Sequence, residues 1–206
     1  MPGLMSHIAF GQMYAEAHPG VETAAFVRGA TFPDIRLITR WPRERTHWNG
    51  TTLERVAAVT GSWQAGMEFH NWLDDAWNEY FFAYGLVFGR PEDESSWLAL
   101  KLMAEHEAYR ELHDHDELTR ALRAWGEYEL TFGASEEEIK CWYGAMSRHL
   151  ASLPSETSWR TWLRDLGFRH AHFYGALQRL EVLQSDAEWR RRVSDCHARI
   201  KERVSI

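Results

Sequence analysis

Helix-start signals, with no strand pattern between them, constrain the fold of this chain more than any other feature. Ser135-x-x-Glu138 and Ser185-x-x-Glu188 each place a glutamate three residues after a serine, the capping box that begins a helix. Apolar residues recur at helical spacing along most of the chain, and no run of any length alternates apolar and polar residues. The sequence therefore predicts an all-α fold, a single domain over residues 1–206 built as a bundle of about seven or eight helices.

One irregular stretch interrupts the first half of the chain. Helices are expected over residues 6–17, 21–29 and 53–82, with a loop over 30–50. Ser6 is expected to cap the first helix, and Thr51-x-x-Glu54 to begin the third as a capping box. The third region is either one long helix or two helices that separate near Gly61 or Gly66.

The second half, residues 85–206, is expected to supply supporting helices. The first of them should start at Pro91-Glu92-Asp93-Glu94, because proline and acidic residues both suit a helix N-terminus. Most of the 11 tryptophans recur at helical spacing and are therefore expected in the core.

Composition excludes several classes of protein. The net charge is -7, from 23 basic and 30 acidic residues, which argues against a general binder of double-stranded nucleic acid. The two cysteines, Cys141 and Cys196, form neither a disulfide framework nor a thiolate metal site. No apolar run approaches the ~20 residues of a membrane span, and the first residues have no basic secretory pattern, so a cytoplasmic location is expected.

The pair His70 and Asp74 is the sharpest sign of chemistry. Because the two residues are four apart in a predicted helix, their side chains lie on one face and can hold one cation between them. Phe69 and Trp77 can pack beside the pair and lower the local dielectric. An isolated pair of this kind is more often an ordinary hydrogen-bonded neighbourhood than a metal site.

Three further residues strengthen the metal hypothesis. His7 lies on the first predicted helix, Asp34 follows Pro33 in the loop, and His47 stands between a threonine and a tryptophan. The proline biases the preceding residue towards extended backbone. Imidazole and carboxylate together suit zinc, and also manganese or iron, better than calcium.

Four short motifs also carry a resemblance to a known family. They are Ser-His-Ile-Ala-Phe-Gly (6–11), Arg-Gly-Ala-Thr-Phe-Pro-Asp (28–34), Thr-His-Trp (46–48) and Phe-His-Asn-Trp-Leu-Asp-Asp-Ala-Trp (69–77). In the same order, they resemble motifs of the zinc-dependent phospholipase C family, above all the amino-terminal domain of glycosylphosphatidylinositol-specific phospholipase D. The related single-strand nucleases share that fold and metal cluster. The resemblance covers roughly residues 5–80.

The resemblance implies an all-α bundle that holds clustered zinc ions, with manganese or iron as substitutes, and hydrolyses a phosphoester with a metal-activated water. The metal ligands that it implies are His7, Asp34, His47, His70 and Asp74. Family members carry further ligands for a third ion, but the nearest matching position here is Asn78, so two ions are expected. The substrate would be a phospholipid or a small soluble phosphodiester or nucleotide.

Positive charge in the same loop suggests how a phosphate could be held. Arg36, Arg40, Arg43 and Arg45 lie between the two loop ligands, and one or two of them are expected to reach the site. Arg40 and Arg43 are the candidates, beside Asp34, for a catalytic role. Trp48 is expected to line the mouth of the site.

Two other interpretations remain open. An HD-type metal phosphohydrolase is also all-α, and the run His113-Asp114-His115-Asp116 has the required residue types, although such a run is more often a solvated turn. The other alternative is a non-catalytic helical protein in which the same side chains form a structural metal site or a hydrogen-bond network.

Overall fold

The described part of the chain is all-helical in the computed structural model, which confirms the predicted fold class. Residues 3–83, 94–167 and 170–206 are described, and no strand occurs in them. The elements are α1 (Leu4–Ala17), α2 (Thr23–Thr31), η1 (Phe32–Ile35), α3 (Arg36–Thr39), η2 (Arg43–Arg45), α4 (Leu53–Ala58), α5 (Ser62–Phe82), α6 (Glu94–Glu111), α7 (His115–Arg123), α8 (Glu127–Thr131), α9 (Glu136–Leu150), α10 (Glu156–Asp165), α11 (His170–Ser185) and α12 (Ala187–Val204). The helices outnumber the expected seven or eight because the loop and the turns contain short ones such as α3, α4 and α8.

Helices α2 and α5 pack with their backbones in close approach. A Cβ atom on Gly29 would lie 1.9 Å from the Trp63 carbonyl oxygen, and one on Gly66 would lie 2.2 Å from the Phe26 carbonyl oxygen. Only glycine allows the two backbones to approach so closely. Gly66 therefore stays inside α5, and the break that the sequence left open lies at Gly61, the N-cap of α5.

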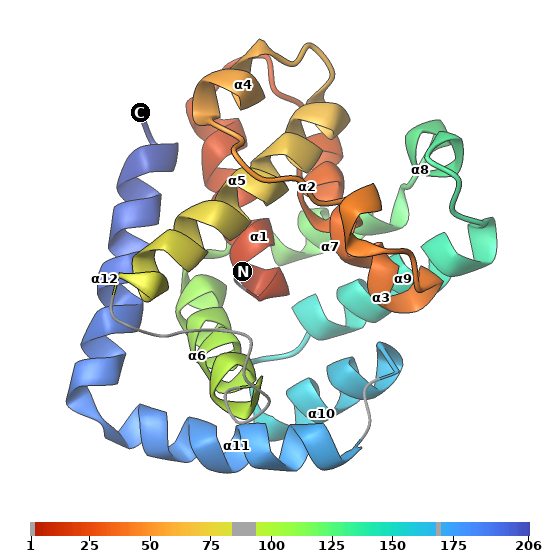
Figure 1. Ribbon diagram of the computed structural model, residues 1–206. Helices are drawn as coiled ribbons and strands as arrows, with labels where there is room; N and C mark the ends of the chain where they lie inside the picture. The colour runs from red at the N-terminus through yellow and green to blue at the C-terminus, as the bar shows by residue number, and fades with distance from the viewer. Residues whose placement is uncertain (1–2, 84–93, 168–169) are drawn as a thin grey trace.

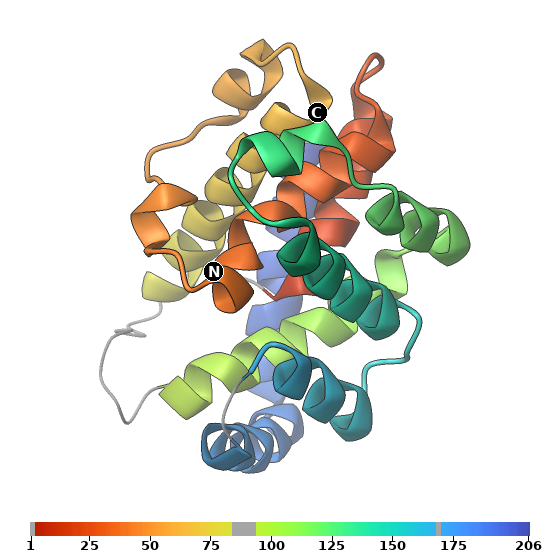
Figure 2. The same ribbon diagram turned by 90° about the vertical axis from the view of Figure 1, so that its right-hand side faces the viewer.

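The two halves of the chain share one hydrophobic core. Helix α6 packs against α1, α11 and α12, and α11 lies below it in both views (Figures 1 and 2). The buried cluster extends from Leu4 at the start of α1 to Val204 at the end of α12 and includes Trp142, which is fully buried. This confirms that tryptophans at helical spacing serve as core residues.

Two predicted helix caps shift by one residue, and a third is confirmed. Ser135 and Glu138 form the expected capping box. Thr52, rather than Thr51, caps α4, because the Thr51 hydroxyl donates to Glu68 instead. Asp186, rather than Ser185, caps α12. The predicted start at Pro91–Asp93 lies outside the described residues.

The start of α1 is set by a distant residue. The helix begins at Leu4 after Gly3, so Ser6 is not its cap but a buried position inside it. The backbone N–H of Met5 points to the carboxylate of Glu105 in α6, 3.5 Å away. A carboxylate at a helix N-terminus satisfies free N–H groups and opposes the helix dipole. The partner is 100 residues away in sequence, which local reasoning cannot detect.

None of the described helices is long and apolar enough to cross a membrane.

Candidate metal centre

Five side chains predicted as ligands converge on one buried point in the bundle. His7 comes from α1, Asp34 from η1, His47 from the segment after η2, and His70 and Asp74 from α5. Two groups of three can each hold a metal ion, with ligand atoms within 4.8 Å of one another. They are His7, His70 and Asp74, and Asp34, His47 and His70.

Phe32 and Pro33 bring Asp34 into the centre by a route that differs from the prediction. The step before Pro33 was expected to be extended, but Phe32 has the helical angles φ -62° and ψ -37°. Helix α2 continues directly into the 3-10 turn η1, in which Pro33 occupies the first turn, where its missing N–H removes no hydrogen bond. Asp34 is thereby held one turn beyond α2 and next to His47.

Hydrogen bonds to the main chain fix which nitrogen of His70 faces the centre. Its Nδ1 lies 2.8 Å from the Ala30 carbonyl oxygen, which can only accept, so Nδ1 carries the proton. The neutral ring then has a lone pair on Nε2. Donation of one ring N–H to a backbone carbonyl is the usual arrangement around a metal-binding histidine.

Thr46 fixes His47 in the same way. The Thr46 hydroxyl donates its only proton to the Pro33 carbonyl oxygen at 3.0 Å. It must therefore accept from Nδ1 of His47, 2.8 Å away. The lone pair of His47 is then also on Nε2, and the Nε2 atoms of His47 and His70 face each other at 3.1 Å. Two lone pairs at this distance repel unless a cation, either a proton or a metal ion, lies beside them.

His7 and the carboxylates distinguish a metal ion from a proton. The His7 side chain is 1% exposed, and neither of its ring nitrogens has a hydrogen-bond partner. Its ring stacks on His70 at 4.0 Å between centroids, and its Nε2 lies 3.5 Å from Asp74 Oδ1. Buried polar groups without partners are rare and costly. One proton between His47 and His70 leaves both His7 nitrogens without partners, whereas a metal ion would take one of them as a ligand.

Asp74 lies at the centre of the group. Its Oδ2 accepts a hydrogen bond from Arg43 at 3.0 Å and lies 3.8 and 3.9 Å from the Nε2 atoms of His47 and His70. Asp34 Oδ1 lies 3.5 Å from Nε2 of His47 and, like Asp74 Oδ1, has no hydrogen-bond partner. His70 belongs to both groups of three, but an imidazole offers one lone pair and can bind only one ion. If two ions were bound, they would therefore have Asp74, with its two oxygens, and not His70, as their common ligand.

The protonation states suit metal ligation. Burial lowers the pKa of His70 to about 3, and the positive charge that His7 can carry adds to this effect. Burial alone would raise the pKa of Asp34, but the adjacent imidazoles of His47 and His70 outweigh it and hold that pKa well below its usual range. For Asp74, burial is again outweighed, by His70 and His7, so its pKa is also low. A neutral imidazole and two ionised carboxylates are the forms that bind metal.

The four loop arginines divide into two pairs. Arg43 bonds Asp74, and Nε of Arg36 lies 3.8 Å from Asp34 Oδ1, beyond hydrogen-bond distance. The guanidinium of Arg40 lies beside Gly167, and no hydrogen bond or ion pair joins it to the centre within the described ranges. Arg45 covers the ring of Trp41. Of the two arginines predicted to be catalytic, the structure brings Arg43 to the centre and not Arg40.

Trp48 and the His-Asp run have partners outside the group of five. The indole N–H of Trp48 donates to Glu68 on another face of α5, and Trp48 lines a pocket of about 340 Å³ whose lining includes none of the five predicted ligands. His113 is exposed in the turn between α6 and α7, where it bonds Glu16. Among the described residues, none of His113 to Asp116 joins a group of three ligands.

Lys101 is a neighbour of the centre that sequence reasoning missed. It lies on α6, and the carboxylates of Asp34 and Asp74 and the guanidinium groups of Arg36 and Arg43 all act on its charge. No motif surrounds it in the sequence. The helical stripe of Trp97, Lys101 and Glu105, each four residues apart, is the only local signal that could have pointed inward.

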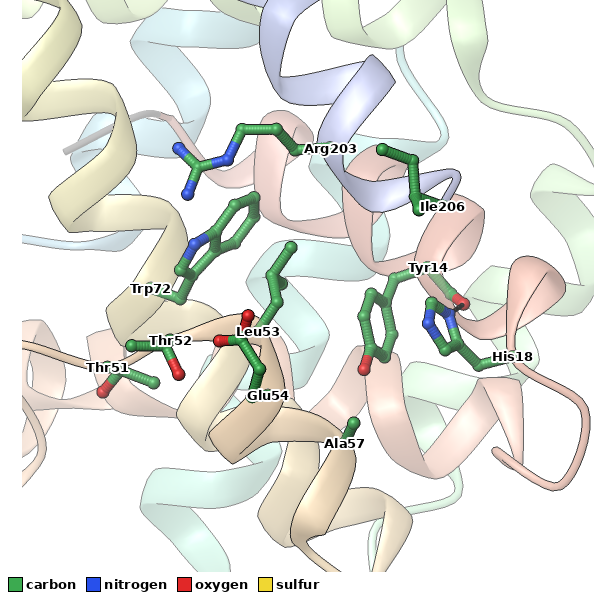
Figure 3. Close-up of a pocket in the computed structure, with 10 residues that line it drawn as sticks. All are labelled: Tyr14, His18, Thr51, Thr52, Leu53, Glu54, Ala57, Trp72, Arg203 and Ile206. Atoms are coloured by element: carbon green, nitrogen blue, oxygen red, sulfur yellow. Dashed lines mark hydrogen bonds between the residues drawn. The ribbon is translucent and has the colours of Figure 1, made fainter.

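A separate pocket of about 550 Å³ lies between the C-terminal half of α1, the start of α4 and the end of α12. In Figure 3, Tyr14 and His18 form one side of this pocket, and Arg203 lies over Trp72 on another. None of the five predicted ligands lines it, so it is distinct from the metal centre.

Comparison of the chain with protein-family models, with curated proteins and with solved structures finds no match.

Proposed function

We propose that this protein is a metal-dependent hydrolase of phosphoesters. The observation that carries the proposal is the pair of Nε2 lone pairs of His47 and His70, which face each other at 3.1 Å between two carboxylates whose pKa values are low. The Nδ1–H of His70 donates to the Ala30 carbonyl oxygen, and the Nδ1–H of His47 donates to the Thr46 hydroxyl. These two hydrogen bonds hold the rings in that orientation. Such a set has the donors and the charge that zinc prefers, with manganese or iron as alternatives.

Each residue of the centre has a separate role in this proposal. His7, His70 and Asp74 would hold one ion, and Asp34 and His47, with the second oxygen of Asp74, the other. A divalent ion held there supplies Lewis acidity, which acidifies water and neutralises charge on phosphoryl oxygens. Arg43, already 3.0 Å from Asp74, is placed to bind a phosphate oxygen by charge-assisted hydrogen bonds.

The choice of phosphoesters follows from the positive rim of the centre. Arg36 and Arg43 both point at the carboxylates, and Nε of Arg36 is a buried donor without a hydrogen-bond partner. A guanidinium group matches the oxygens of a phosphate in shape and charge. The same five ligand residues carry the likeness to zinc-dependent phospholipases C, which agrees with this substrate class.

A structural metal site without catalysis is the second candidate, and one observation favours it. His7, His70 and Asp74 are at most 2% exposed, which is deeper than an open catalytic site requires. In a structural site the protein closes the coordination shell and leaves no position for a substrate.

Elemental analysis followed by an activity assay separates these possibilities. Purified protein is analysed for bound metal, then assayed with p-nitrophenyl phosphate and bis-p-nitrophenyl phosphate while zinc, manganese and iron are added in turn. The proposal expects bound metal and turnover in the wild type, and loss of both in Asp74→Asn.

Asp75→Asn is the matched control. Asp75 is the next residue on α5 but accepts from the Gly50 N–H instead of facing the centre. It should keep both metal and activity. Stoichiometric metal with no turnover of either ester would leave the structural site as the correct interpretation.

A further inference from the structure

Lys101 is a half-buried lysine on the turn of α6 that faces the two ligand-bearing helices α1 and α5. One turn before it on α6, Trp97 packs edge-on against Trp77 of α5, with 4.8 Å between ring centroids. Trp77 lies three residues after Asp74. One turn after Lys101, Glu105 meets the backbone of Met5 in α1, two residues before His7. The turn of α6 that carries Lys101 is thus anchored on both helices that bear ligands of the centre.

The charge of Lys101 has no carboxylate partner in the described ranges. Its Nζ lies 5.9 Å from the ring of Trp97, and no hydrogen bond or ion pair is made by it there. Burial lowers the pKa of Lys101, the carboxylates of Asp34 and Asp74 raise it, and Arg36 and Arg43 lower it again. A desolvated cation among other cations is unfavourable unless an anion joins them.

The balance of charge around the centre is positive even before any ion binds. Arg36, Arg43 and Lys101 supply three positive side chains, while Asp34 and Asp74 supply two negative ones. Each divalent ion would add two more positive charges, so a singly charged phosphodiester would leave much of this field uncompensated.

We propose that Lys101 binds a second negative charge of the substrate, so that the centre selects dianionic phosphoesters, of which phosphomonoesters are the simplest. This inference rests on the proposed function, which sets the phosphoester at the metal centre. The same positive field disfavours esters whose alcohol carries a cation, such as phosphorylcholine esters. Lys101 is therefore a specificity residue and not a metal ligand.

Phosphate binding tests the role of Lys101 without any turnover. Binding of inorganic phosphate is measured by calorimetry at low salt, on protein as purified and on metal-loaded protein. Lys101→Met removes the charge and keeps much of the apolar stem, and it should weaken binding roughly tenfold, the effect of one charge near a second charge in a partly buried site. Lys101→Arg should restore most of the affinity.

Lys140→Met is the matched control, because Lys140 pairs with Glu136 on the exposed face of α9. It should bind phosphate as the wild type does. Metal content should be unchanged in all three variants. In turnover, the preference for p-nitrophenyl phosphate over p-nitrophenyl phosphorylcholine, as a ratio of kcat/KM, should fall about tenfold in Lys101→Met and stay constant in Lys140→Met.

The outcomes separate this inference from the proposed function. Equal phosphate affinity in Lys101→Met and wild type, or no phosphate binding by either, overturns the role of Lys101 even if the protein hydrolyses esters. Phosphate binding that depends on Lys101, with bound metal but no hydrolysis of any ester, supports the anion site and overturns the hydrolase.

Discussion

Replacing Thr46 by valine tests the orientation of the two histidines most directly. The Thr46 hydroxyl donates to the Pro33 carbonyl oxygen at 3.0 Å and accepts from His47 Nδ1 at 2.8 Å. Valine has the same shape and removes both bonds. The His47 proton can then move to Nε2, where it can donate to Nε2 of His70, 3.1 Å away. This internal hydrogen bond competes with the metal for the same lone pairs.

The expected loss of metal affinity is about 10- to 100-fold, the usual cost of removing a group that orients a ligand, which corresponds to about 1.4 to 2.8 kcal/mol. The free energy of unfolding of the metal-free protein should fall by a further 1 to 3 kcal/mol, roughly, because a buried carbonyl loses its partner. Metal affinity is measured by competition with a chromophoric chelator, and stability by urea unfolding in EDTA.

Thr31→Val is the control for Thr46→Val. Thr31 is equally buried, and its hydroxyl donates to main-chain carbonyls of α2 without touching a histidine. It should lose a similar amount of stability and keep its metal affinity. If Thr46→Val binds zinc as tightly as the wild type, the tautomer argument is wrong, and with it the main support for the metal centre.

Three other predictions follow from the packing and the charges. Gly29→Ala should destabilise the protein by more than about 3 kcal/mol in urea unfolding, because its Cβ would lie 1.9 Å from a backbone oxygen of α5, whereas Gly126→Ala, with nothing within 4 Å, should change stability little. In metal-free protein, the lowered pKa of His70 means that the unfolded state binds more protons, so the free energy of unfolding should fall as the pH falls from about 6.5 to about 3, and this slope should weaken in His70→Gln. A flat profile over that range would contradict a neutral buried ring. Arg43→Met should lower the melting temperature of the metal-free protein more than that of the metal-loaded protein, because only in the metal-free protein is Arg43 needed to balance the charge of Asp74. Equal shifts would show that the Arg43–Asp74 ion pair is merely an exposed contact.

Helix starts show where local sequence is sufficient and where it is not. Ser135 and Glu138 cap α9 as predicted, since both partners lie within one turn. Ser6 does not cap α1, because Glu105 approaches from α6 and the helix extends back to Leu4. Local reasoning succeeds when the partner is a few residues away and fails when packing supplies a better one.

In the loop between α2 and α4, local sequence also failed to predict the direction of a side chain. The sequence predicted that one or two of its arginines reach the site, with Arg40 and Arg43 as candidates; Arg36 and Arg43 lie near the carboxylates, whereas Arg40 lies beside Gly167. Arg40 adopts the left-handed backbone conformation, with φ at 59°, at the end of the four-residue helix α3. The direction of its side chain follows from that turn, which no spacing rule in the sequence reveals.

By itself, the sequence determined the helical class and the i, i+4 placement of His70 and Asp74, because both depend on backbone periodicity within a single helix. It also contained the other three candidate ligand residues, His7, Asp34 and His47. Only the tertiary structure decided that α1, η1 and the segment after η2 bring those residues to α5, which nitrogen of His47 and of His70 faces inward, and that the turn of α6 with Lys101 packs against α1 and α5. These properties depend on hydrogen bonds and charges between segments far apart in the chain, and such contacts exist only once the helices have packed.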